Sequence, residues 1–324
     1  VGDEAGTAIT TGDYNTALGY FALYTEDTAS KSTAVGTSAL QVQNAGTVDA
    51  FNTAVGFAAG VAVTTGVQNT LIGGLAGDAI TTASYNTAVG HTSLGLNTTG
   101  ADNVAIGWAA LGANTTGSDN VAVGKQALDA NTTGATNTAL GDRALTTNTT
   151  ASNNTAVGAD ALYANTTGAN NTAVGGQGVL DANTTGSQNT AIGGGALSSN
   201  TTASNNTSVG HASLIRNTTG ASNVAVGVDA LNFNSTGTRN VALGALALDA
   251  NTVGDKNIAI GMDALGANVD GSRSVAIGDS ALLAQDPASA VEMYNTAVGH
   301  AAGSSVTTGT HNTLIGGLAG DAIT

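Results

Sequence analysis

The sequence predicts an all-β fold, a parallel β-solenoid (β-roll) of 17-residue coils. The motif N-T-A-V-G-x-x-A-L-x-x-N-T-T-G-x-x recurs along all 324 residues, in steps of 17 except for three steps of 20, 18 and 21. Large side chains are scarce, because 46 residues are Gly and only 3% are aromatic. A short, regular period marks one coil of a solenoid. The first residue of each coil, Asn or Ser, lies at 15, 32, 52, 69, 86, 103, 120, 137, 154, 171, 189, 206, 223, 240, 257, 274, 295 and 312.

The array predicts one continuous unit over residues 1–324, with about 18 coils. Its most regular block runs from 86 to 273, and coils with longer loops flank it at 32–51 and 274–294. Length variation of this kind is expected at an exposed edge of a solenoid. Residues 295–324 nearly repeat residues 52–81, so we expect a segment of a longer repetitive protein.

Alternation within N-T-A-V-G predicts a strand, because successive side chains of a strand point to opposite faces. The fourth position is always Val, Ile or Leu, and the second is Thr, Val or Ile. We therefore expect these two positions to face the core and the small third position to face a second packed surface. With a second strand in each coil, stacked coils would form parallel ladders.

The ninth position predicts a core column, because Leu occupies it, with one single-residue shift, from residue 94 to residue 282. A helix over A-L-x-x-N is the alternative, but the segment is short and its Gly and Asn-Thr-Thr neighbours are poor helix formers. The predicted core Leu column is Leu94, Leu111, Leu128, Leu145, Leu162, Leu180, Leu197, Leu214, Leu231, Leu248, Leu265 and Leu282.

The fifth-position Gly and the N-T-T-G segment predict the corners, because Gly tolerates positive φ and Asn bonds its own backbone. Asn side chains stacked from coil to coil also hydrogen-bond one another. The predicted structural Asn ladder, at the twelfth position, is Asn97, Asn114, Asn131, Asn148, Asn165, Asn183, Asn200, Asn217, Asn234, Asn251 and Asn268.

Composition disfavours several functions. The net charge is −15 with only 7 Lys and Arg, which argues against nucleic-acid binding. No apolar run approaches the ~20 residues of a membrane helix. The chain has no Cys and shows no spacing typical of a catalytic site, so we expect no enzyme.

No cofactor and no metal site are expected. His91, His211 and His300 share one coil position but lie in distant coils, which favours surface variation over a metal site. Aspartates recur in two columns, for which solvated surface is the favoured interpretation and weak calcium binding the alternative. These columns are Asp129, Asp181 and Asp249, and Asp160, Asp229 and Asp263.

The five-residue cores, such as S-V-A-I-G at Ser274 and N-V-A-I-G at Asn103, resemble the head repeats of YadA-like trimeric autotransporter adhesins. The resemblance covers essentially the whole chain, although the 17-residue coil is longer than the family's usual one. It implies left-handed parallel β-rolls, three chains side by side, that project from a bacterial surface and bind matrix or host molecules.

Together these observations predict a non-enzymatic, structural and adhesive surface fibre: a rigid, extracellular β-rod, a homotrimer, anchored to the outer membrane elsewhere in the full chain. Its partners would be host, matrix or neighbouring-cell molecules, with end-to-end or lateral self-assembly. A phage tail fibre or extracellular filament subunit is one alternative. An ice-binding solenoid is another, disfavoured here because the second-position Thr alternates with Val that is expected to be buried.

Overall fold

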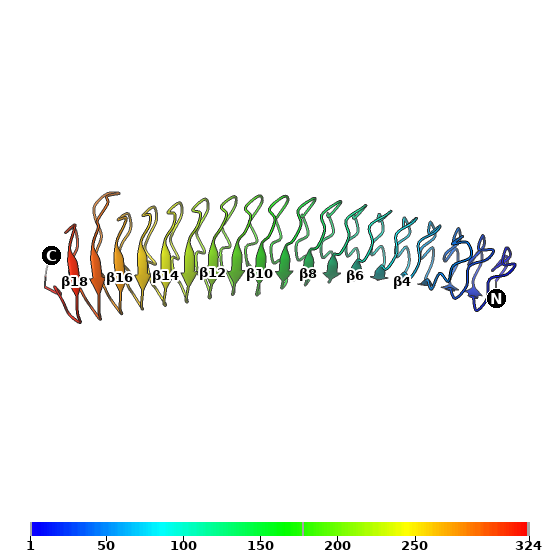
Figure 1. Cartoon of the computed structure of the whole chain (residues 1–324), viewed down its shortest axis with the longest axis horizontal. Helices are drawn as coiled ribbons and strands as arrows, with labels where there is room; N and C mark the ends of the chain where they lie inside the picture. The colour runs from blue at the N-terminus through cyan, green and yellow to red at the C-terminus, as the bar shows by residue number, and fades with distance from the viewer. Residues whose placement is uncertain (1, 177, 323–324) are drawn as a thin grey trace. The chain divides into compact units, whose positions relative to one another are not determined.

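The computed structural model describes residues 2–176 and 178–322, and these form the all-β parallel solenoid that the sequence predicts, with no helix. The chain divides into two compact units, Val1–Thr167 and Gly168–Thr324, and Figure 1 shows their strands as arrows. The first contains β1 Thr16–Leu18, β2 Thr33–Val35, β3 Thr53–Val55, β4 Thr70–Ile72, β5 Thr87–Val89, β6 Val104–Ile106, β7 Val121–Val123, β8 Thr138–Leu140 and β9 Thr155–Val157. The second contains β10 Thr172–Val174, β11 Thr190–Ile192, β12 Thr207–Val209, β13 Val224–Val226, β14 Val241–Leu243, β15 Ile258–Ile260, β16 Val275–Ile277, β17 Thr296–Val298 and β18 Thr313–Ile315.

Within each unit, neighbouring strands are parallel and pair at identical coil positions. Between β5 and β6, for example, Ala88 lies beside Ala105. The Thr87 N–H donates to the Asn103 carbonyl at 2.8 Å, and the Gly107 N–H donates to the Val89 carbonyl at 2.8 Å. This register stacks each side chain on its equivalent in the next coil, so every coil position becomes a straight column within its unit.

The predicted orientation of the strand is wrong. From β2 to β17 the middle residue is buried, whereas the residues on either side of it are half-exposed or exposed. Ala105 is completely buried, and Ile106 beside it is 39% exposed. The small third position therefore faces a core too thin for a larger side chain in most coils, and the aliphatic fourth position faces outward.

The prediction of two strands per coil is also wrong among the described residues, where each coil has one three-residue strand followed by turns. These turns place Leu of the ninth position in the left-handed region, as at Leu111 with φ 53°. Gly107, at the fifth position, has φ 136°, and a Cβ there would lie 2.4 Å from the Gly124 carbonyl oxygen. The corner at the fifth position thus requires Gly for both backbone conformation and space.

The N-T-T-G corner works differently from the expectation. Its Gly117 has no positive φ, but a Cβ there would lie 2.3 Å from the Gly134 carbonyl oxygen. Close approach of neighbouring coils therefore selects the small residue. Its Asn114 bonds its own backbone, because Nδ2 donates to the Gly117 carbonyl at 2.9 Å.

In the two long-loop coils, at 32–51 and 274–294, Ser and Gln take the places of the two Asn residues. Gln43 is buried, and its Nε2 donates to Ser32 Oγ at 2.9 Å. In the second unit, Ser274 Oγ donates to Gln285 Oε1 at 3.1 Å. In both coils a Ser replaces the first Asn and a longer Gln replaces the twelfth Asn, and the two side chains hydrogen-bond each other directly.

Candidate functional site

The predicted core column and Asn ladder lie inside the solenoid. All twelve leucines of the column have no exposed surface, and neither does any of the eleven asparagines of the ladder. In the first unit, Asn114 Nδ2 donates to Asn97 Oδ1 at 2.7 Å, and Asn131 Nδ2 donates to Asn114 Oδ1 at 2.9 Å. Both columns are thus structural, and neither presents atoms to a ligand.

A second Asn ladder, at the first position, was not predicted. The Asn103 N–H donates to Asn86 Oδ1 at 3.0 Å, and its Nδ2 donates to the Gly117 carbonyl at 3.0 Å. The same Gly117 carbonyl accepts Asn114 Nδ2, so one carbonyl joins the two ladders. The signal was present, because Asn or Ser opens every coil.

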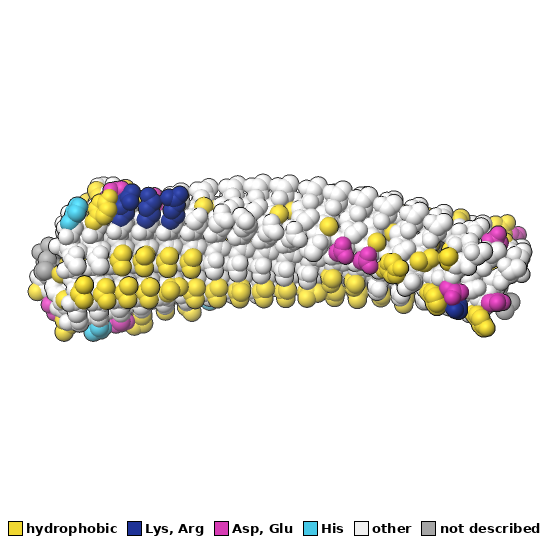
Figure 2. Space-filling view, in the orientation of Figure 1, with side chains coloured by type: hydrophobic (Ala, Val, Ile, Leu, Met, Phe, Trp, Pro, Cys, Tyr) yellow, Lys and Arg dark blue, Asp and Glu magenta, His cyan; other side chains and the backbone are white. Residues whose placement is uncertain are grey.

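The strands present an outer sheet face, which we define as the second and fourth positions of β2–β9 in the first unit and of β10–β17 in the second. The fourth position supplies an aliphatic column, with Ile106 and Leu140 in the first unit and Ile192 and Ile277 in the second each more than a third exposed. Apolar side chains form rows on the viewed surface (Figure 2). A regular apolar surface of this kind marks a candidate interaction site.

The second position makes the other half of the outer sheet face. It holds Thr in most coils and Val or Ile in the rest, and it is half-exposed or exposed throughout the face. In the second unit four neighbouring coils are apolar here, whereas Thr predominates in the first. These four residues are Val224, Val241, Ile258 and Val275.

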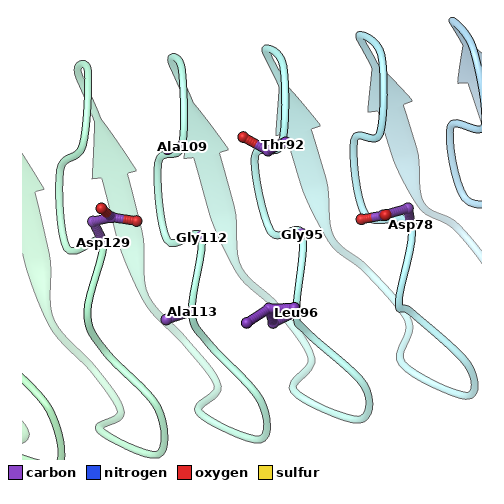
Figure 3. A pocket seen from close by; sticks show the side chains of 8 residues that line it. All are labelled: Asp78, Thr92, Gly95, Leu96, Ala109, Gly112, Ala113 and Asp129. Atoms are coloured by element: carbon purple, nitrogen blue, oxygen red, sulfur yellow. The ribbon is translucent and has the colours of Figure 1, made fainter.

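The first unit also carries a shallow open depression of about 370 Å³, the glycine trough. Gly95 and Gly112 form its floor at the tenth position, where Asp78 and Asp129 stand in the coils on either side. The two carboxylates turn toward the trough from its ends (Figure 3). A Cβ at Gly112 would lie 2.7 Å from Asp129 Oδ1, so the depression exists because these coils lack a tenth side chain.

Partial burial governs the acidity of the trough carboxylates. Desolvation raises the pKa of Asp129, and a hydrogen bond from Gln126 partly opposes it. Desolvation likewise raises the pKa of Asp78, against its own backbone hydrogen bond and the charge of His91. Two half-buried carboxylates and an apolar floor suit a cationic group, but no nucleophile with a base lines the trough.

The two predicted Asp columns lie close enough for their charges to interact. In the second unit, burial raises the pKa of Asp249, and the charges of Asp263 and Asp229 raise it further. His300 Nδ1 lies 3.3 Å from Asp279 Oδ2, and both side chains are exposed. Within residues 2–176 and 178–322, no group of three His, Cys, Asp or Glu could hold a metal ion.

Several exposed aromatic side chains are paired with cations. Lys125 Nζ lies 5.7 Å from the Trp108 ring, and the Arg216 guanidinium lies 4.1 Å from the Phe233 ring. Each pair joins neighbouring coils. Sequence reasoning missed these contacts because the residues are 17 apart, a spacing that brings them together only in a stacked coil.

The comparisons assign no family. No protein-family model matches this chain, and no curated protein matches it. Nowhere in the described residues is there a helix that is long and apolar enough to cross a membrane. Function must therefore be argued from the outer sheet face and the surrounding columns.

Proposed function

We propose that this chain is a non-enzymatic structural and adhesive fibre module that works outside a bacterial cell. The observation that carries the proposal is the outer sheet face. Its aliphatic column is half-exposed or exposed along both units. Exposed apolar patches of this extent are typical of association surfaces.

In this proposal the outer sheet face binds further copies of the chain, and the assembly is a homotrimer. Parallel strands with flat, in-register columns present identical surfaces in every copy, which favours symmetric association. The thin core strengthens the case. A coil centred on one Ala and one Leu, such as Ala105 and Leu111, buries little apolar area to offset its conformational entropy. Association would bury more.

The test is the native mass by sedimentation equilibrium. We expect a mass near three times 31.1 kDa, and we expect Ile106→Asp with Leu140→Asp to reduce it to one chain. A matched control is Thr116→Asp, at an exposed turn in the same unit, which should leave the mass unchanged. A wild-type mass of 31.1 kDa would refute self-association through this face.

A second candidate, an ice-binding solenoid, is favoured by one observation. The second-position Thr lies on the outer sheet face, half-exposed and in register, instead of in the core. Ranks of hydroxyl and methyl groups at a fixed spacing could order water. Thermal hysteresis in the wild-type protein, lost on Thr87→Lys and Thr138→Lys, would support this function over the fibre. The absence of hysteresis would remove it.

A further inference from the structure

One residue in each coil, immediately before the first Asn, forms an exposed line that we call the turn ridge. Its members adopt the left-handed region, with φ 60° at Asp119 and 59° at Lys256. Each backbone is fixed to the preceding coil. The Asp119 N–H donates to the Ala101 carbonyl at 3.1 Å, and the Lys256 N–H donates to the Thr238 carbonyl at 2.9 Å. The ridge therefore presents one side chain per coil at a constant spacing, ~4.8 Å.

The turn ridge carries the highest local concentration of positive charge in the chain. Arg239, Lys256 and Arg273 occupy it in three consecutive coils of the second unit, and they are three of only 7 Lys and Arg. Figure 2 shows Lys and Arg side chains gathered in a row on the viewed face of this unit. On a chain of net charge −15, this row is a distinct basic surface.

Part of the same ridge in the first unit carries the opposite charge, although Lys31, which is paired with Asp49, also belongs to it. Asp102 and Asp119 occupy it in consecutive coils, and Tyr85, 53% exposed, occupies the coil before them. No ion pair involves either carboxylate in the part of the chain that the structure describes. Because both rows belong to one coil position, the spacing between charges is the same in each row.

The three basic residues differ in what already neutralises them. Arg273 Nε lies 2.6 Å from Glu292 Oε1, and its guanidinium lies 5.7 Å from the Tyr294 ring. Within residues 178–322, Arg239 and Lys256 form no ion pair. The nearby Asp255 instead accepts hydrogen bonds from the Thr238 N–H and hydroxyl. Arg239 and Lys256 thus lack an ion pair among these residues, although the charge of Lys256 helps to lower the pKa of Glu292, whereas Arg273 is paired.

We propose that the turn ridge docks a second copy of this chain in antiparallel orientation. Asp119 of one copy then faces Arg239 of the other, Asp102 faces Lys256, and Tyr85 faces Arg273. A parallel arrangement in which Asp102 faces Arg239 and Asp119 faces Lys256 also pairs both carboxylates, but it leaves Arg273 opposite Thr136, which is neither charged nor aromatic. The antiparallel order pairs the same groups and in addition places the Tyr85 ring opposite Arg273.

The inference deepens the proposed function and rests on it, because rods that project from two facing cells meet in antiparallel orientation. Because the acidic and basic rows have the same spacing, a second copy of this chain is favoured over an unrelated anionic partner. Exposed ion pairs are individually weak and are screened beyond a Debye length of ~8–10 Å at physiological salt. Docking should therefore weaken as salt rises, and its test should change two pairs at once.

Charge exchange provides the first test. At low salt, wild-type protein should sediment as an assembly larger than its high-salt form. Asp102→Lys with Asp119→Lys should abolish the increase, and so should Arg239→Asp with Lys256→Asp. An equal mixture of these two variants should restore it. If the wild type shows no low-salt increase, or the variants retain it, the proposal is overturned. Binding of polyglutamate by a wild type that does not self-associate would also overturn it.

Cross-linking tests the orientation, since the chain contains no Cys. Asp119→Cys mixed with Arg239→Cys should form a disulfide-linked pair under mild oxidation, and faster than Asp119→Cys mixed with Lys256→Cys, the competing parallel register. Faster linkage in the second mixture would overturn the antiparallel model. Adding Ile106→Asp and Leu140→Asp to the first mixture separates the two proposals. These changes should remove outer-sheet-face assembly and leave the cross-link intact.

Discussion

Two kinds of coil in the first unit fill the same core in different ways. The regular coil that starts at Asn103 places Ala105 on the strand and Leu111 in the turn, both buried. The alanine- and glycine-rich coil that starts at Asn69 does the reverse, with Leu71 on the strand and Gly77 in the turn. The large side chain has moved from the ninth to the third position, so the core conserves volume and not residue identity.

The exchange extends to the twelfth position. Asn114 of the regular coil belongs to the amide ladder, whereas the other coil has Ile80, which is equally buried. A Cβ at Gly77 would lie 2.8 Å from both Ile80 Cδ1 and Leu71 Cδ2, so these two side chains occupy the space that the ninth-position Leu fills elsewhere. One Asn ladder can thus be exchanged for apolar packing. The first-position ladder passes through both kinds of coil.

The largest expected effect comes from emptying the regular core. Leu111→Ala should destabilise the protein by about 2–5 kcal/mol, because the surrounding coils cannot collapse into the cavity. Chemical denaturation measures the loss, with hydrogen exchange to localise it, because long repeat arrays need not unfold in one step. Leu96→Ala, at a position 58% exposed, is the matched control and should change stability by less than about 0.5 kcal/mol. Equal losses would contradict the core assignment.

A smaller effect should follow from overfilling the other coil. Gly77→Leu should cost about 1–3 kcal/mol through its clash with Leu71. The backbone is not the cause, since Gly77 has φ 56° and Leu111 tolerates φ 53°. Adding Leu71→Ala should therefore recover much of the loss and convert the coil toward the regular type. If the double variant lost as much stability as the two single variants together, the two positions would not share one space.

The twelfth position should respond according to its surroundings. Asn114→Val removes the donor to Asn97 Oδ1, and a buried group left unsatisfied costs about 1–3 kcal/mol, whereas the Gly117 carbonyl keeps its hydrogen bond from Asn103 Nδ2. Ile80→Val places the same residue at the same position and should cost only about 0.5–1.5 kcal/mol. Denaturation of the two variants side by side measures the difference. If Asn114→Val were the milder change, the amide ladder would contribute no net stability.

The sequence alone was sufficient for the repeat and the fold class, because period, turn residues and the Leu column need no knowledge of direction. The sequence alone could not show which face of the strand is buried. Apolar Val and Ile at the fourth position suggested an interior, whereas the structure places Ala105 inside and Ile106 outside. Alternation fixes which residues share a face, but not which face is buried. The opposite changes at Leu71 and Gly77 were the missed signal. A larger side chain at one position compensates for a smaller one at the other only if both positions face the core.

The candidate sites show the same limit. The outer sheet face and the glycine trough depend on which column faces water and on which neighbours lack a side chain. The turn ridge was hidden for another reason. Its cations look scattered when counted along the chain, and they become a row only when residues 239, 256 and 273 are stacked coil on coil.

The smallest expected effect concerns the exposed layer, where the two kinds of coil should behave alike. Asp78 belongs to the alanine- and glycine-rich coil and Asp129 to a regular one, yet burial raises the pKa of both above the usual 3.8. The folded state therefore holds these protons more tightly than the unfolded state does. Ionisation of these groups costs stability above the raised pKa, and stability is regained as pH falls toward 3.8.

Asp129→Asn should accordingly raise the melting temperature slightly at neutral pH, with a difference that shrinks as the pH is lowered through the raised pKa. Asp78→Asn should act in the same direction, and carboxyl NMR titration should place both groups above 3.8. His91→Ala should raise the pKa of Asp78 further, because it removes the charge that lowers that pKa, and should leave Asp129 unchanged. If the pKa values of Asp78 and Asp129 shifted in opposite directions, the two kinds of coil would differ at the surface as well as in the core.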